Sequence, residues 1–133
     1  MYKSPDAIAS IPERAIESTF PMTDKAALSI LDIGAGTGMV GEKCAARGFT
    51  SLVAIDLSPN MLAIAEKKSI YKTMVCDSLY NWRQHFQTGQ FDVVISCGVF
   101  TPGQLKPIAL DEIICLAKPG KQNSYLLNFQ SRI

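Results

Sequence analysis

Apolar positions along the chain fall into short continuous runs, separated by segments whose apolar residues recur at helical intervals. The runs are rich in Val and Ile and predict strands over residues 27–33, 51–56, 71–76, 91–96 and 125–129. Strands that are apolar at nearly every position are typical of parallel sheets, which helices cover on both faces. The alternation therefore predicts an α/β fold, namely a three-layer αβα sandwich with right-handed crossovers.

The intervening segments carry the signals of helices, which the pattern predicts over residues 37–47, 58–68 and 108–117. Ser58 and Pro59 supply an N-cap and a proline at the first helical position. Near the amino terminus, apolar residues recur at helical intervals over residues 4–20. Pro12 interrupts this pattern, and we expect a second short helix to begin there at Glu13.

The composition limits the chain to one globular domain, which we expect to span residues 1–133. Of these residues 47% are hydrophobic, enough for one core, and the length is too small for two domains of ordinary size. The net charge of +1 comes from 13 Lys and Arg against 12 Asp and Glu, without a long run of either sign. The sequence therefore has no electrostatic footprint for nucleic acid, and a small, weakly charged substrate is expected.

The cysteines favour a reducing compartment and argue against a metal site such as zinc. They form no C-x-x-C pair and have no histidine at ligand spacing, and their apolar surroundings predict burial of Cys44, Cys76, Cys97 and Cys115. No apolar run approaches the roughly 20 residues of a membrane span, and the amino terminus does not resemble a signal peptide. We therefore expect a soluble cytoplasmic protein with no membrane contact.

A glycine-rich turn follows the first predicted strand, where residues 31–38 read L-D-I-G-A-G-T-G. A second apolar run, V-A-I-D, ends at Asp56. Glycines let the backbone turn sharply and approach a ligand, while a carboxylate at the end of the neighbouring strand can bind a ribose diol. Ligands of such sheets lie outside the carboxyl ends of the strands. The pairing predicts an adenosine-containing cofactor at that edge.

Two glycine patterns overlap in this turn and indicate different cofactors. Residues 34–38 fit G-x-G-x-G, whereas residues 36–41 fit G-x-G-x-x-G, the dinucleotide fingerprint. Asp32 favours the first, because a carboxylate at the ligand's edge would repel a pyrophosphate and attract a sulfonium or an ammonium.

From Asp32 to Gly38 the chain resembles the class I S-adenosylmethionine-dependent methyltransferases, whose first motif is a hydrophobic strand followed by D/E-x-G-x-G-x-G. The resemblance implies a Rossmann-like, mostly parallel sheet of five strands in the order 3-2-1-4-5, with S-adenosyl-L-methionine as cofactor. It implies that the glycine loop holds the methionine moiety, that Asp56 accepts from the ribose hydroxyls, that Met61 covers the adenine and that Asp77 accepts from the adenine amine. The full set of implied cofactor contacts is Asp32, Gly34, Gly36, Gly38, Asp56, Leu57, Met61, Asp77, Ser78 and Ser96.

Several of these residues also have an ordinary structural interpretation. The glycines could serve only to pack a helix on a strand, and Asp56 could be a capping residue before Ser58. Core packing accounts for Met61 at least as well as adenine contact does. A turn aspartate would give the same pattern as Asp77.

The loop after the fourth predicted strand departs from the pattern of amino-group methyltransferases. Relatives that methylate exocyclic or amide nitrogens carry N/D-P-P-Y/F there, whereas this chain has Ser96-Cys97-Gly98-Val99, which argues against DNA amino-methylation. Methyl transfer from a sulfonium depends mainly on alignment and proximity, so no catalytic base is required. We name no catalytic residue: His85 fits a surface helix, and Cys97 has no identifiable base or orienting partner.

The stretches A-I-D-L-S-P-N-M-L, S-C-G-V-F-T-P-G and L-A-K-P-G resemble one branch, the methyltransferase-like proteins related to that of the Williams-Beuren syndrome region. Members of that branch begin with a further helix and continue past the fifth strand with a helix and an antiparallel hairpin. The resemblance therefore implies a core domain truncated at both ends, without the hairpin. The fifth strand would then be an exposed edge, which favours a homodimer through that edge, another pairing partner or poor solubility.

These observations give three functional hypotheses. The first is S-adenosylmethionine-dependent methyl transfer to a small molecule. The second is a non-catalytic protein that binds S-adenosylmethionine or S-adenosylhomocysteine, and the third is an NAD-binding oxidoreductase based on residues 36–41.

Overall fold

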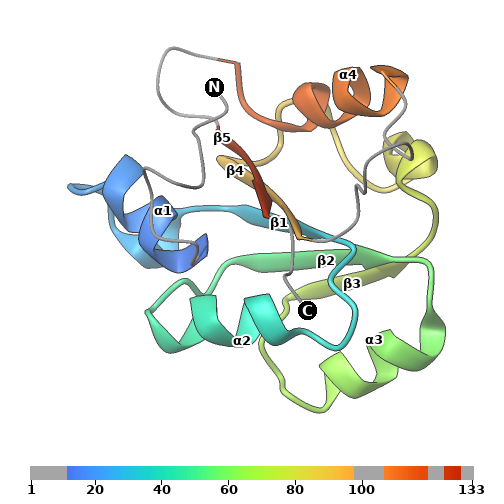
Figure 1. Cartoon of the computed structure of the whole chain (residues 1–133), viewed down its shortest axis with the longest axis horizontal. Coiled ribbons are helices and arrows are strands. Elements are labelled where there is room, and N and C mark those ends of the chain that lie inside the picture. The colour runs from blue at the N-terminus through green and yellow to red at the C-terminus, as the bar shows by residue number, and fades with distance from the viewer. Residues whose placement is uncertain (1–11, 98–106, 120–124, 130–133) are drawn as a thin grey trace.

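A computed structural model of the chain describes residues 12–97, 107–119 and 125–129. Its helices and strands alternate along the sequence (Figure 1). The strands are β1 (Ile30–Ile33), β2 (Leu52–Asp56), β3 (Thr73–Cys76), β4 (Val93–Cys97) and β5 (Tyr125–Phe129). The α-helices are α1 (Pro12–Thr19), α2 (Met39–Ala46), α3 (Pro59–Glu66) and α4 (Pro107–Leu116), and two short 3-10 helices are η1 (Lys25–Ala27) and η2 (Leu79–Gln84).

The five strands form one parallel sheet in the order β3-β2-β1-β4-β5. The central strand β1 pairs with β2 on one side, where Ile33 lies opposite Ile55, and with β4 on the other, where Ile33 lies opposite Ser96. This register brings the carboxyl ends of the central strands to one edge of the sheet. The predicted α/β fold and strand order are confirmed.

Helices cover both faces of the sheet, with α2 and α3 on one side and α4 on the other (Figure 1). Residues of the central strands β1, β2 and β4 therefore enter two separate cores. One core, beside α1 and α2, contains Ile16, Leu28, Ile30, Cys44, Phe49, Leu52, Val93 and Ile95. The other, beside η2 and α4, contains Leu31, Ile33, Ile55, Val75, Trp82, Phe86, Phe91, Val94, Ile113 and Leu116. These cores confirm the three-layer sandwich.

Three strands begin two or three residues later than predicted, for local reasons. The fourth strand, predicted from Phe91, begins at Val93, because Phe91 forms only an isolated bridge with Ala117. Ala27 closes η1 instead of beginning the first strand, which starts at Ile30, because Asp24 caps that turn through the Ala26 N–H at 3.1 Å. Tyr71 precedes β3 instead of beginning it, since pairing with β2 starts at Thr73. The helix predicted to begin at Glu13 begins at Pro12, and residues 4–11 of the longer predicted pattern lie outside the described residues.

The expectation of buried cysteines is correct for Cys44 and wrong for Cys76. Cys76 belongs to the edge strand β3, where only Val75 turns into the core beside η2 and α4, so its thiol is exposed. Cys115 is intermediate, and the side chain of Cys97 lies outside the described part of the structure. Within the described residues, no helix has the length and apolarity that crossing a membrane requires.

Candidate active site

The glycine loop connects the carboxyl end of β1 to the start of α2. Gly34, Gly36 and Gly38 have φ of 67°, 59° and 89°, values that L side chains rarely adopt. The N–H groups of Gly34 and Ala35 donate to the Ile55 carbonyl of β2 at 2.8 and 3.4 Å. The loop is thus tied to the neighbouring strand, and its backbone is held at the edge where a ligand would lie.

Asp56 fixes this loop from the end of β2. One carboxylate oxygen accepts from the Gly36 N–H at 2.8 Å, and the other accepts from the Ser58 N–H at 2.8 Å. Ser58 in turn caps α3 by accepting from the Met61 N–H at 3.2 Å. The N-cap of α3 is thus Ser58 and not Asp56, which stabilises the turn before the helix. Because an ionised carboxylate has about four acceptor positions, Asp56 can also receive two ribose hydroxyls.

Leu57 and Met61 lie beyond Asp56 as apolar side chains open to solvent, with 72% and 47% of their surface exposed. A Cβ placed on Gly36 would lie 3.6 Å from the Met61 sulfur. Met61 therefore lies next to the glycine loop, and the core-packing interpretation is wrong. Exposed apolar side chains at this position can cover an aromatic base.

Asp32 is the buried anion of the site, with 2% of its surface exposed. Burial is the main cause that raises the Asp32 pKa, a hydrogen bond from Tyr71 lowers it, and the Asp56 charge adds a smaller increase, so that the net pKa is about 6. The Tyr71 hydroxyl donates to Asp32 Oδ2 at 2.6 Å. Sequence reasoning missed Tyr71, because it lies 39 positions from Asp32 in a connection without periodicity.

Gly41 accommodates the Tyr71 ring against α2. A Cβ at Gly41 would lie 2.2 Å from the Tyr71 hydroxyl oxygen and 2.5 Å from Cζ. The third glycine of the G-x-G-x-x-G pattern is therefore explained by packing of this ring. Gly41 therefore gives no separate support to the binding of a dinucleotide cofactor.

We expect Gly41→Ala to lower the free energy of unfolding by about 1 to 2 kcal/mol. Overpacking of this kind costs about 1 to 3 kcal/mol, which outweighs the gain of at most about 1 kcal/mol from replacing a helical glycine by alanine. Urea denaturation monitored by circular dichroism measures the difference. Ala46→Gly, at an exposed position of the same helix, should lose at most the propensity contribution. A stability of Gly41→Ala equal to or above that of the wild type would contradict the close packing.

Asp77 follows β3 and is held in a cluster with η2. Its Oδ1 accepts from the Ser78 N–H at 2.7 Å and from Asn81 Nδ2 at 2.9 Å, and its Oδ2 lies 2.8 Å from His85 Nε2. His85, Asn81 and the Ser78 amide lower the Asp77 pKa to about 2, so the side chain is ionised at neutral pH. The turn role considered for Asp77 is present, and contact with adenine stays a prediction.

Ser78 and Ser96 occupy different environments at the same edge. The Ser78 hydroxyl accepts from the Tyr80 N–H at 3.2 Å and so caps η2. Ser96 is buried at the end of β4, and its Oγ has no hydrogen-bond partner among the described residues. A buried hydroxyl without a partner is unfavourable, so Ser96 Oγ is suited to a ligand. Residues 98 and 99 of the sequence motif lie outside the described residues.

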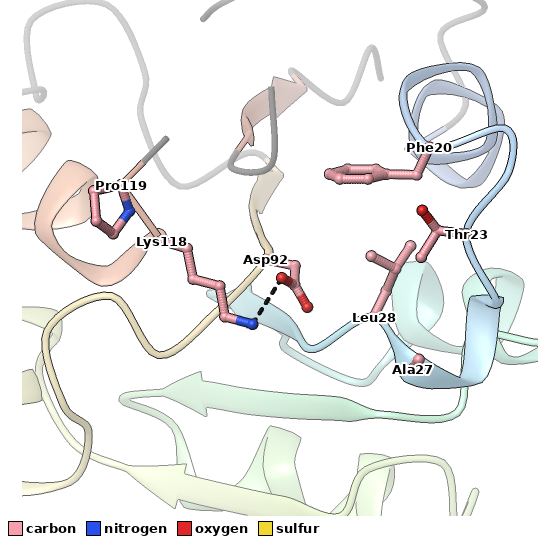
Figure 2. A pocket seen from close by; sticks show the side chains of 7 residues that line it. All are labelled: Phe20, Thr23, Ala27, Leu28, Asp92, Lys118 and Pro119. Atoms are coloured by element: carbon pink, nitrogen blue, oxygen red, sulfur yellow. Dashed lines mark ion pairs between the residues drawn. The ribbon is translucent and has the colours of Figure 1, made fainter. Parts of the chain in front are cut away.

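A pocket lies at the opposite edge of the sheet, before the starts of β1 and β4. This pocket of about 380 Å³ is lined by Phe20, Thr23, Ala27, Leu28, Asp92, Lys118 and Pro119 (Figure 2). Its charges satisfy each other, because Lys118 Nζ lies 2.9 Å from Asp92 Oδ1. The pocket therefore offers no free charge to a ligand and lies away from the predicted cofactor residues.

The residues at the carboxyl edge fit S-adenosylmethionine. Asp32 would supply an anion for the sulfonium or ammonium, and Asp56 would supply a bidentate acceptor for the ribose. Ser96 carries a buried hydroxyl that has no partner in the described part of the chain. A pyrophosphate would instead meet the carboxylates of Asp32 and Asp56. No cluster of three or more His, Cys, Asp or Glu suited to a metal ion occurs among the described residues.

Comparisons with known proteins identify the family. A family model of a methyltransferase domain matches residues 30–120, which is more than half of the chain. Human methyltransferase-like protein 27 is 34% identical over 91 residues, covering 68% of this chain and 37% of the human protein. The family-model match includes the glycine loop and runs past the end of α4.

Solved structures show the same fold. A Methanococcus maripaludis protein assigned as an S-adenosyl-L-methionine-dependent methyltransferase superposes with a TM-score of 0.69 at 23% identity, over 92% of this chain and 56% of that one. Phosphoethanolamine N-methyltransferase 2 of Haemonchus contortus, solved with phosphomonomethylethanolamine and S-adenosylhomocysteine, gives 0.62 at 28% identity, over 79% and 25%. This chain thus spans between about a quarter and a little over half of the length of these relatives. From the family match and the fold, it belongs to the class I S-adenosylmethionine-dependent methyltransferases.

Proposed function

We propose that the chain binds S-adenosylmethionine at the carboxyl edge of the sheet and transfers its methyl group to a small-molecule acceptor. The observation that carries this proposal is the pair of carboxylates around one glycine loop. Asp32 is buried beside the start of α2, and Asp56 holds the Gly36 amide from β2. A ligand with a cation and a ribose diol suits both carboxylates.

The bound cofactor would supply a methyl group activated by its attachment to a sulfonium. When the methyl group is transferred to the acceptor, the sulfonium sulfur becomes a neutral thioether. The chain's residues contribute binding and orientation. Asp56 holds the ribose and the loop, Leu57 and Met61 cover the base, and Asp32 attracts the positive charge. Alignment of this kind accelerates a displacement without acid or base help, so no residue is assigned as a catalytic base. His85 pairs with Asp77 at the end of η2, and because methyl transfer from a sulfonium requires no base, it receives no catalytic role in our proposal.

A small acceptor is supported by the near-neutral composition and by the Haemonchus enzyme, which was solved with phosphomonomethylethanolamine. The family match favours this proposal over the NAD-binding oxidoreductase considered from the sequence. The identity of the acceptor does not follow from the fold, because one fold hosts many substrates.

Calorimetric titration with S-adenosylhomocysteine and NAD in parallel tests the cofactor. We expect saturable binding of S-adenosylhomocysteine and none of NAD, and the reverse result would overturn the proposal. Release of S-adenosylhomocysteine from S-adenosylmethionine, measured with a panel of small amines, thiols and alcohols, then tests transfer. Tight binding without release for any acceptor would support the non-catalytic alternative.

The homodimer expected from the sequence stays a prediction. β5 lies at one end of the sheet, and no described strand pairs with its outer side. Unpaired backbone groups along such an edge favour association with another strand. We expect size-exclusion chromatography with light scattering to give the mass of a dimer at high protein concentration. A monomer mass across the whole concentration range would contradict the prediction.

A further inference from the structure

Tyr71 contacts three parts of the candidate site at once. It lies in the connection between α3 and β3, and its hydroxyl donates to Asp32 Oδ2 on β1 at 2.6 Å. A Cβ built on Gly38 would lie 3.3 Å from Tyr71 Cε2, and one built on Gly41 would lie 2.2 Å from the Tyr71 hydroxyl oxygen. The ring is thus held against the start of α2, with its hydroxyl directed at the carboxylate.

We propose that Tyr71 is a positioning residue whose hydroxyl orients the Asp32 carboxylate and keeps it anionic, so that the site retains a cationic ligand at neutral pH. The identity of the cationic ligand rests on the proposed function. The positioning role of Tyr71 rests on its hydrogen bond to Asp32. The hydroxyl occupies one carboxylate oxygen, and a carboxylate can accept at both. Asp32 is thereby oriented without losing its capacity for a ligand.

The surrounding charges explain why a buried carboxylate needs this donor. Burial and the Asp56 carboxylate both favour the neutral form of Asp32, whereas the Tyr71 hydrogen bond favours the charged form. On the Tyr71 side, burial first and then the Asp32 charge raise the pKa of the phenol well above its usual range, with a smaller contribution from Cys44 of α2. Tyr71 therefore remains a protonated donor throughout the neutral range.

Tyr71→Phe removes the donor and keeps the ring. In protein labelled with carboxyl ¹³C aspartate, NMR should show the Asp32 titration midpoint move upward by about one pH unit, as expected for loss of a hydrogen bond to a charged group. This measurement needs no ligand. An unchanged midpoint in a folded Tyr71→Phe variant would overturn the inference.

Titration of S-adenosylmethionine by calorimetry between pH 5.5 and 8.5 provides the ligand readout. At pH 8.5 the dissociation constants of the wild type and Tyr71→Phe should agree within about twofold, because Asp32 is ionised in both. At pH 6.0 the variant should bind about fivefold more weakly. Equal weakening at every pH would indicate packing alone and would also overturn the inference.

Two controls separate this inference from the proposed function. Tyr80→Phe removes the hydroxyl of an exposed tyrosine on η2 and should follow the wild-type pH profile. In an Asp32→Asn background, Tyr71→Phe should change the binding profile by less than twofold. If the wild type binds no S-adenosylmethionine at any pH, the proposed function fails, and the NMR titration alone decides the role of Tyr71.

Discussion

Asp56→Ala should weaken binding of S-adenosylhomocysteine by about 10- to 100-fold, or about 1.5 to 3 kcal/mol, the usual contribution of hydrogen bonds to a charged group. The same change removes the acceptor of the Gly36 and Ser58 N–H groups. We therefore also expect about 1 to 2 kcal/mol lower stability from the lost loop and cap contacts. Calorimetry gives the affinity, and urea denaturation gives the stability.

The two effects are separated by a ligand that lacks one ribose hydroxyl. The wild type should bind S-adenosylhomocysteine more tightly than its 2′-deoxy analogue, whereas Asp56→Ala should bind both equally, since the acceptor of that hydroxyl is gone. Asp24→Ala is a matched control, because Asp24 caps η1 through the Ala26 N–H at the other edge of the sheet. It should leave both affinities unchanged. Retained discrimination in Asp56→Ala would show that Asp56 acts only as a turn residue.

The sequence was sufficient for features whose signal is local. The αβ alternation gave the layers, and Ser58 with Pro59 correctly marked the start of α3. Asp32, Asp56, Asp77 and Ser96 follow or end predicted strands, so a parallel sheet necessarily places them at one edge. For these residues the fold follows from the pattern, and the proposed site follows from the fold.

Features that depend on distant contacts were not predictable from one sequence. Tyr71 meets Asp32 only once α3 and β3 are packed. The 3-10 helix η2 has no α-helical periodicity, and its buried Trp82 is held by a hydrogen bond of 2.6 Å to Glu112 of α4, 30 positions away. Gly41 matched a nucleotide fingerprint, yet the ring of Tyr71 is what requires a glycine there.

Asp32→Asn should stabilise the protein at neutral pH and lower its affinity for S-adenosylmethionine. Burial raises the Asp32 pKa from 3.8 to about 6, a difference that corresponds to about 3 kcal/mol. Because the folded-state pKa is raised, the folding free energy becomes less favourable as pH rises from about 4 to about 6, and the full cost persists above that. An asparagine does not ionise, and its carbonyl can still accept from Tyr71.

We therefore expect Asp32→Asn to raise the free energy of unfolding by about 1 to 3 kcal/mol at pH 7.5 and to have almost no effect below pH 4. Urea denaturation across this pH range measures the difference. Affinity for S-adenosylmethionine should fall at pH 7.5, since the cation loses its buried partner.

Asp92→Asn is the matched control with the opposite sign. Burial raises the Asp92 pKa, but the Ser29 N–H, Lys118 and the Ser29 hydroxyl together lower it below its usual value. Its ionised form thus stabilises the fold above the ordinary aspartate pKa, and that contribution is lost as pH falls. Asp92→Asn should therefore destabilise the protein at pH 7.5 and leave cofactor affinity unchanged.

If both variants lost stability at pH 7.5, burial of the Asp32 charge would not be a cost to folding. If Asp32→Asn alone gained stability and lost affinity, the same buried charge would be unfavourable for the fold and required by the ligand.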